Sequence, residues 1–445
     1  MTHRNLRRSN DHFARTSQRL PLGVASSFRY WGDDRTFYIA RGEGGRVWDI
    51  DDNDYVDYRL GYGPAILGYA DPRVDEAARE GMNVGGVFGL ATELEFVVAE
   101  RIARMVPTAE MVRYSNSGTE AVMAALRISR AYTGKDGFVM VEGGYHGLFD
   151  AVLWYSDVEN WDGTGDPAIQ PYSEGVPEIV KSLIYPVPLN DANRLEDLFK
   201  QHGDKIGTFL IEPMMGNCCS ITATREYMQA VRELCDRFGV LMIIDEVKTG
   251  FRVAKGGIQE LLGVEADLCT FAKAIANGYP ISVVAGRREY MSKIGDGVAH
   301  GGTYTAHSVS IAAANKTLEI LDETDALTSI QYYGTELQTG LSNILGQRGI
   351  PHSFVGHPSM FGLFFSESPP TNYRDWKRTD YSLYDRLALK LHDVGIIVEP
   401  DSREPWFMCE AHDVESLRET LDKFERAVDI TLRKLSADKM TTKMA

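Results

Sequence analysis

The chain has 445 residues, of which 44% are hydrophobic, 25% are charged and 10% are aromatic. This composition is typical of a folded globular protein and excludes a disordered, collagen-like or low-complexity chain. The 63 acidic residues outnumber the 47 basic ones and give a formal net charge of −16. So negative a surface disfavours binding to nucleic acid or to an anionic membrane. We therefore expect small-molecule ligands.

The five cysteines include no CxxC pair. We expect neither a disulfide framework nor a zinc site, and no other metal site is predicted. No apolar run approaches the ~18 residues that a membrane helix needs. The N-terminal twenty residues hold five arginines and are interpreted as a solvated amphipathic arm, because they lack the apolar stretch of a secretory signal. A cytoplasmic location is expected.

A series of short apolar runs predicts the fold. Residues 46–58 alternate apolar and polar positions around an Asp-rich turn, which predicts a β-hairpin. Further along, an amphipathic helix is predicted from Tyr227 to Phe238, ended by Gly239. Apolar strands alternating with helices predict an α/β fold whose mostly parallel sheet is covered by helices. The predicted strands of this sheet are residues 138–142, 208–213, 240–246, 267–272 and 282–286.

After about residue 325 the pattern changes to two helical stretches, at about 326–348 and 412–435, that flank short strands. Together with the N-terminal hairpin, they predict a smaller α+β domain built from both chain ends. The expected division is an N-terminal arm and hairpin at residues 1–60, a large domain at 61–325, and the C-terminal part of the small domain at 326–445.

The segment NSGTEA at residues 116–121 follows a short apolar run and opens a predicted helix. Backbone N–H groups at a helix start carry partial positive charge and can bind phosphate. The ordinary alternative is a helix N-cap, a role that Ser117 or Thr119 would fill. Taken alone, this segment favours the N-cap.

Three further segments place reactive side chains after predicted strands, where ligands bind in such sheets. In YHG, Tyr145 could lie flat on a planar ring and His146 could hydrogen-bond near it. Asp245 ends a strongly apolar strand and would need a partner when buried. Lys273 follows another apolar strand, where loss of solvent makes a lysine nucleophilic. A surface lysine is the ordinary alternative.

Together these features fit one cofactor, pyridoxal 5′-phosphate. The helix start would hold the phosphate and Tyr145 would stack on the ring. Asp245 would keep the pyridine nitrogen protonated, and Lys273 would hold the aldehyde carbon. No one of the four segments carries this prediction alone.

The chain resembles the class III, fold-type I pyridoxal-phosphate aminotransferases, and it is most similar to their glutamate-1-semialdehyde 2,1-aminomutase branch. The resemblance extends from about residue 20 to about residue 430. It rests on the segments PLGVASSFRYW, YGPAILGYADPRV, GLATELE, RYSNSGTEAVMAALRISRAYTG, EGGYHG, IEPMMGN, IIDEVKTGFR, LCTFAKAIANGYP and GGTY.

The resemblance implies a role for each matching residue. Lys273 would form the internal aldimine, Asn217 would hydrogen-bond the ring hydroxyl, and Val247 would pack on the ring face opposite Tyr145. Thr303 would reach the phosphate of a neighbouring subunit, which implies a homodimer. The candidate cofactor-binding residues are Ser117, Gly118, Thr119, Tyr145, His146, Glu212, Asn217, Asp245, Val247, Lys273 and Thr303.

Arg29 is the candidate substrate-binding residue. In the aminomutase branch and in some β-amino-acid aminotransferases, an arginine after a similar segment binds the substrate carboxylate, a task that suits a bidentate guanidinium. A surface arginine is the ordinary alternative.

The segments that would surround the substrate differ from the aminomutase branch. Residues 302–308 read GTYTAHS instead of GTLSGNP, and residues 145–150 read YHGLFD instead of YHGHAD. GYP replaces GMP, and Lys248 stands where methionine is common. These differences spare the cofactor anchors.

The predicted activity is therefore a pyridoxal-phosphate aminotransferase that moves an amino group between a carboxylate-bearing amino compound and an oxo acid. Lys273 would be the catalytic base and Asp245 would stabilise the ring. The alternative is a glutamate-1-semialdehyde 2,1-aminomutase, which moves the amino group within one molecule. An amino-acid racemase and a non-catalytic protein of the same fold are less expected.

Overall fold

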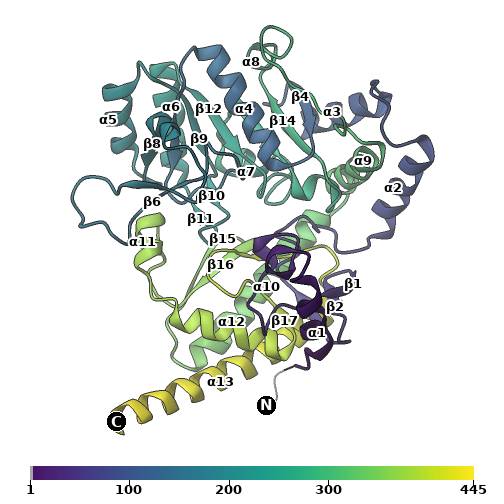
Figure 1. Cartoon of the computed structure of the whole chain (residues 1–445), viewed down its shortest axis with the longest axis vertical. Coiled ribbons are helices and arrows are strands. Elements are labelled where there is room, and N and C mark those ends of the chain that lie inside the picture. Colours follow the sequence, from purple (N-terminus) through teal and green to yellow (C-terminus); the bar gives the residue numbers. More distant parts are fainter. Residues whose placement is uncertain (1–3, 445) are drawn as a thin grey trace.

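A seven-stranded sheet forms the centre of the larger part of the molecule in the computed structural model, which describes residues 4–444 (Figure 1). Its spatial order is β4-β14-β13-β12-β9-β5-β8, and only β14 is antiparallel to its neighbours. The bounds are β4 Met111–Ser115, β5 Gly137–Val141, β8 Ile184–Val187, β9 Ile206–Ile211, β12 Leu241–Asp245, β13 Leu268–Phe271 and β14 Ser282–Gly286. The predicted α/β fold with a mostly parallel sheet is confirmed, and each predicted strand lies in this sheet.

Helices cover both faces of the sheet, so its central strands are buried along their whole length. One face packs against α4 and α8, and the other packs against α5 and α6. Helix α6 starts where the Thr224 hydroxyl accepts a hydrogen bond from Tyr227 N and ends at Gly239 with φ +64°. The bounds are α2 Pro72–Val84, α3 Glu93–Met105, α4 Gly118–Thr133, α5 Ala192–His202, α6 Arg225–Phe238, α7 Gly257–Leu262, α8 Arg288–Met291 and α9 Ser308–Glu323.

The smaller part of the molecule contains both chain ends (Figure 1). The predicted hairpin is β2–β3, and β17 lies parallel to β3 with Ile396 opposite Val56. The domain limits at residues 60 and 325 stay predictions. The bounds are β1 Ile39–Glu43, β2 Arg46–Asp49, β3 Asp54–Asp57, α10 Ala326–Gln347, β15 Ser353–His357, β16 Met360–Phe364, α11 Tyr373–Arg378, α12 Ser382–Val394, β17 Ile396–Ile397, β18 Trp406–Phe407 and α13 Val414–Met444.

The arginine-rich arm forms helix α1, Arg7–Thr16, which contacts the hairpin turn. The Ser9 backbone N–H and hydroxyl both donate to Asp51 Oδ2, at 2.8 and 2.6 Å. None of the helices within residues 4–444 is long and apolar enough to cross a membrane. The remaining short elements are η1 Pro21–Gly23, η2 Ser27–Arg29, β6 Trp154–Ser156, β7 Ile169–Pro171, η3 Glu178–Leu183, β10 Met214–Met215, β11 Ile221–Thr222 and η4 Lys273–Ala276.

Candidate active site

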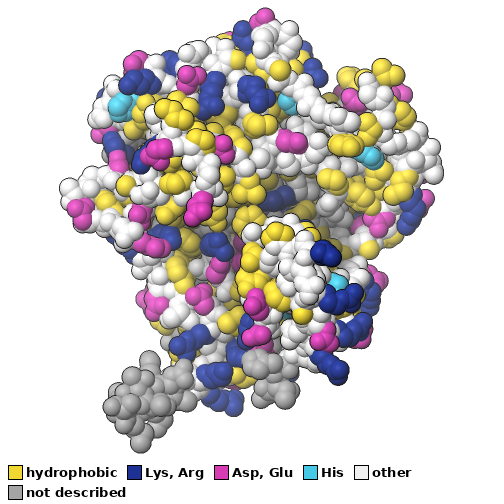
Figure 2. Space-filling model, viewed as in Figure 1, with side chains coloured by type: hydrophobic (Ala, Val, Ile, Leu, Met, Phe, Trp, Pro, Cys, Tyr) yellow, Lys and Arg dark blue, Asp and Glu magenta, His cyan; other side chains and the backbone are white. Residues whose placement is uncertain are grey.

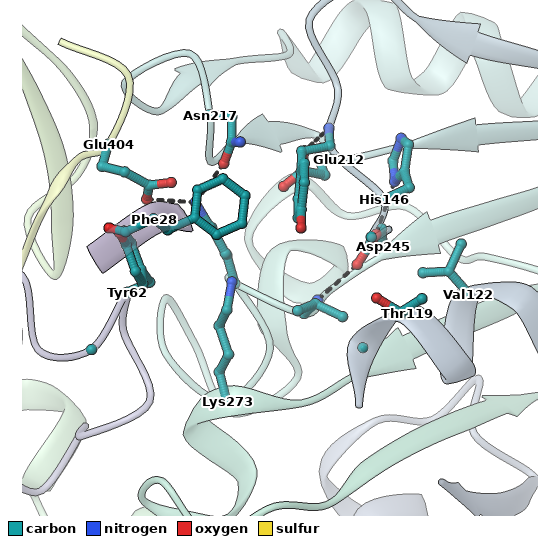
Figure 3. Close-up of a pocket in the computed structure, with 16 residues that line it drawn as sticks. Phe28, Tyr62, Thr119, Val122, His146, Glu212, Asn217, Asp245, Lys273 and Glu404 are labelled. Carbon is teal, nitrogen blue, oxygen red and sulfur yellow. Dashed lines mark hydrogen bonds and ion pairs between the residues drawn. The ribbon is translucent and has the colours of Figure 1, made fainter. Parts of the chain in front are cut away.

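A cavity of about 230 Å³ lies beyond the carboxyl ends of β5, β9, β12 and β13 (Figure 3). Ligands bind at this edge of a parallel sheet because the loops after neighbouring strands converge there. Both chain ends also contribute to its wall. The lining residues are Phe28, Gly61, Tyr62, Gly118, Thr119, Val122, Tyr145, His146, Gly147, Glu212, Asn217, Asp245, Val247, Lys248, Lys273 and Glu404.

The start of α4 lies at one end of the cavity. Ser117 is the N-cap: its hydroxyl accepts from Glu120 N, and the Glu120 carboxylate accepts from the backbone N–H groups of Ser117 and Asn116. A Cβ on Gly118 would lie 3.1 Å from the Val247 methyl groups, so a glycine fits this close approach best. The positive end of a sixteen-residue helix is thereby directed at the cavity.

Asp245 is the last residue of β12 and is almost completely buried. Its Oδ2 lies 2.8 Å from His146 Nδ1, and its Oδ1 accepts hydrogen bonds from Val247 N at 3.0 Å and from Thr270 Oγ1 at 3.1 Å. A buried carboxylate is stable only when it is paired in this way. The carboxylate therefore has a fixed orientation in the cavity wall.

Lys273 follows β13, and its side chain extends into the cavity (Figure 3). Its φ of +50° is unusual for a residue with a side chain. Burial and the nearby ammonium of Lys248 lower the pKa of Lys273 to about 7. A large share of this amine is therefore unprotonated near neutral pH.

Glu212 follows β9 and fixes two loops of the site. Its carboxylate accepts hydrogen bonds from Tyr145 N at 2.8 Å and from Gly216 N at 3.3 Å. Burial raises the pKa of Glu212. Tyr145 lies edge-on to Phe28, with 6.4 Å between ring centroids, and burial raises the pKa of Tyr145 to about 12. The tyrosine ring is thus held in the cavity wall as a neutral aromatic surface.

Comparisons with known proteins agree with this arrangement. The family model described as "Aminotransferase class-III" matches residues 29–428. The chain belongs to the class-III aminotransferases. It is 37% identical to a glutamate-1-semialdehyde 2,1-aminomutase from Thermus thermophilus, over 94% of this chain and 99% of that one.

Two solved structures are similar to this class-III aminotransferase over nearly their whole length. An omega-transaminase from Sphaerobacter thermophilus has a TM-score of 0.89 and 29% identity, and the match covers 95% of this chain and 97% of that one. A structure described as "Transaminase with PLP bound" has a TM-score of 0.87 and 29% identity, with 97% and 99% covered.

Pyridoxal 5′-phosphate is the cofactor of this class-III aminotransferase, as predicted. The residues present fit it: the cavity offers helix-start N–H groups at one end, the Lys273 amine, and a buried carboxylate at Asp245. His146 Nε2 is buried and has no hydrogen-bond partner among residues 4–444. The chemistry of these donors and acceptors is therefore suited to a phosphorylated, aldehyde-bearing pyridine.

The structure brings most of the predicted site residues of this aminotransferase together and leaves three outside the cavity lining. Ser117 lies next to the lining as the N-cap of α4. Arg29 is exposed at the end of η2, beside Phe28, which does line the cavity. Thr303 lies in a separate cavity lined by residues 86–92. The predicted residues in the lining are Gly118, Thr119, Tyr145, His146, Glu212, Asn217, Asp245, Val247 and Lys273.

Sequence reasoning missed several lining residues. Phe28 stands next to the predicted site residue Arg29, so proximity in sequence was an available signal. Lys248 was noted only as a departure from the aminomutase branch and was not assigned a role. Glu404 is different, because it comes from the C-terminal part of the chain and follows no strong strand pattern. The other missed residues are Gly61, Tyr62, Val122 and Gly147.

Proposed function

We propose that the chain catalyses amino transfer within one substrate molecule, as a glutamate-1-semialdehyde 2,1-aminomutase. The observation that carries this proposal is the 37% identity to the Thermus thermophilus enzyme of that name over 94% of this chain. The proposal reverses the order in which the sequence alone ranked the two activities. A cytoplasmic location stays a prediction.

The geometry of the cavity supports the following cofactor-binding roles. The N–H groups at the start of α4, with Ser117 and Thr119, hold the phosphate. Tyr145 and Val247, which both line the cavity, would contact the two faces of the cofactor ring. Bound pyridoxal phosphate supplies an electron-accepting ring that stabilises negative charge on the carbon beside the substrate nitrogen.

Lys273 holds and moves the proton in this proposal. Its pKa of about 7 leaves the amine free to accept a proton from the substrate carbon and to return it at another carbon. Asp245 holds the ring nitrogen in its protonated form, because a fixed carboxylate in a buried site strongly favours a nearby positive charge. His146 and Thr270 keep that carboxylate in place.

Arg29 is proposed to bind the substrate carboxylate. Arg29 is exposed at the end of η2, directly after Phe28, which lines the cavity. A guanidinium binds a carboxylate with two parallel hydrogen bonds. Arg29→Lys should therefore raise KM more than it lowers kcat, since lysine keeps the charge but loses the paired geometry.

An aminotransferase with a separate donor and acceptor is the second candidate. It is favoured by the ion pair between Lys248 and Glu404, which places a lysine in the cavity wall where methionine is common in the aminomutase branch. The segments YHGLFD and GTYTAHS also depart from that branch. Lys248 contacts the proposed cofactor anchor Asn217, whereas the other two differences spare the predicted cofactor anchors.

We also propose that two copies of the chain form a homodimer and that Thr303 reaches the cofactor phosphate of the partner copy. Thr303 stands apart from the cofactor cavity of its own chain, in a loop next to a cluster of exposed apolar side chains on one side of the molecule (Figures 1 and 2). Exposed apolar clusters of this kind mark protein interfaces. This apolar cluster consists of Met82, Val84, Val87, Phe88, Leu90, Phe96 and Val97.

The deciding experiment offers glutamate 1-semialdehyde to the cofactor-loaded enzyme with no other amino donor or acceptor. Complete conversion to 5-aminolevulinate supports the aminomutase, and Lys273→Ala is the control that should show none. If no conversion occurs, while an amino acid removes the visible absorbance of the cofactor and an oxo acid restores it, the second candidate replaces the first.

A further inference from the structure

Lys248 is a buried ammonium in the wall of the cofactor cavity. Only 4% of its side chain is exposed. Its Nζ donates to Asn217 Oδ1 at 2.9 Å and to Glu404 Oε2 at 2.6 Å (Figure 3). Removing a lysine from water is costly unless strong partners replace the water, so this arrangement is maintained by those two contacts.

The backbone makes room for this lysine. A Cβ on Gly216 would lie 2.0 Å from Lys248 Cδ and 2.7 Å from its Nζ, so any side chain there would displace the lysine. Gly216 N is itself held by Glu212. The loop that carries Asn217 therefore also provides, at Gly216, the space that the Lys248 side chain occupies.

The contact with Lys248 fixes which end of the Asn217 amide faces the cavity. An ammonium can only donate hydrogen bonds, so the amide oxygen must face Lys248. The amide Nδ2 is then the end left for a ligand, and it makes no hydrogen bond with any residue in the described part of the chain. Because Asn217 lines the cavity, its N–H groups are available to an oxygen of the cofactor ring.

Glu404 balances the charge of this arrangement. The lysine and the glutamate form an ion pair, so their opposite charges largely offset each other next to Lys273. Without Lys248, the Glu404 carboxylate would stand unpaired and would attract a proton to Lys273.

We propose that Lys248 is a positioning residue that turns the Asn217 amide toward the ring oxygen of the cofactor. This rests on the proposed contact between Asn217 and that oxygen. A hydrogen bond to the ring oxygen draws its negative charge away from the neighbouring proton on Lys273 Nζ, so the bond makes that proton easier to remove.

The test is a pH titration of the visible absorbance of the cofactor-loaded enzyme. Lys248→Met should raise the midpoint by about one pH unit, since the lost contact is a hydrogen bond to a charged oxygen. Asn217→Ala should raise it by a similar amount. The double variant should shift the midpoint by less than the sum of the two single shifts, because part of the effect of Lys248 acts through Asn217 and the rest through the charge that it balances on Glu404. Lys255→Met, which removes an exposed lysine, is the control and should leave the midpoint unchanged.

Three results would overturn the inference: an unchanged midpoint in Lys248→Met, an unchanged midpoint in Asn217→Ala, or shifts that add in the double variant. Should Lys248→Met fail to fold because Glu404 is left unpaired, the same cycle is measured in a Glu404→Gln background, where removing Lys248 leaves no unpaired carboxylate. The absorbance requires no substrate, so the outcome is independent of whether the aminomutase assignment holds.

Discussion

His146 Nδ1 lies 2.8 Å from Asp245 Oδ2, and the two side chains are 0% and 2% exposed. The pair therefore interacts with little screening by water, and the position of the carboxylate depends on the histidine. Variants of the two residues should therefore behave differently. Asp245 would carry the negative charge, and His146 would only hold that carboxylate in position.

Asp245→Asn should lower kcat by about 100-fold or more, because a neutral amide cannot hold the ring nitrogen in its protonated form. His146→Asn should lower kcat by roughly tenfold, since an amide N–H replaces the donor to Asp245. Steady-state kinetics at saturating cofactor make the comparison. Equal losses in both variants would contradict this division of roles.

The reactivity of Lys273 should depend on pH around neutrality. Its pKa is lowered to about 7, so the nucleophilic, unprotonated amine predominates above that pH and is lost below it. The rate at which the cofactor-free enzyme rebinds pyridoxal phosphate should rise with pH, with a midpoint near 7 once the titration of the phosphate itself is subtracted. A midpoint near the ordinary lysine pKa would be inconsistent with this site.

Gly147→Ala should destabilise the fold by about 2 kcal/mol and weaken cofactor binding. Gly147 has φ +103°, and a Cβ there would lie 2.5 Å from Thr119 Oγ1 and 2.8 Å from Thr119 Cα. Gly163→Ala is the matched control: its φ is +89°, but nothing lies within 4 Å of the new Cβ, so it should cost only about 1 kcal/mol. Thermal unfolding measures the loss of stability in each variant. Equal losses would mean that the structure around Thr119 shifts enough to remove the steric clash with the new Cβ.

Leu90→Glu should dissociate the proposed dimer and weaken cofactor binding, because the partner's Thr303 is lost with it. Leu90 is 81% exposed within the apolar cluster, whereas Ile179 is 77% exposed elsewhere on the surface. Ile179→Glu therefore introduces the same charge at a similar exposure and should leave the molar mass unchanged. Light scattering after size exclusion measures both, and a dimeric Leu90→Glu variant would place the interface on another surface.

The central sheet could be predicted because its inner strands are mostly apolar and buried along their whole length, and because helix α6, with clear start and stop signals, separates β9 from β12. The antiparallel direction of β14 was not predicted. Its sequence is as apolar as those of the parallel strands in the sheet, and strand direction is set by the connection rather than by the strand.

The position of two proposed cofactor anchors was predictable for a related reason. Asp245 ends the buried strand β12 and Lys273 lies two residues beyond the buried strand β13, so their place at the edge of the sheet could be inferred from the preceding residues. Glu404 could not be found in this way, because it reaches the cavity through the packing of the C-terminal segment against the larger domain. Such a contact depends on the tertiary fold and leaves no local pattern.

The pairing of β17 with β3 has a consequence for the synthesis of the protein. Strand β3 is made early, yet its partner Ile396 is made near the end of translation. Until then β3 has an unpaired edge that can pair with other chains. The large central sheet is complete once β14 has been made, so it can fold before the C-terminal part of the small domain has been synthesised. The cofactor cavity, which takes Phe28 from near one end of the chain and Glu404 from near the other, is therefore completed only after the central sheet has been made.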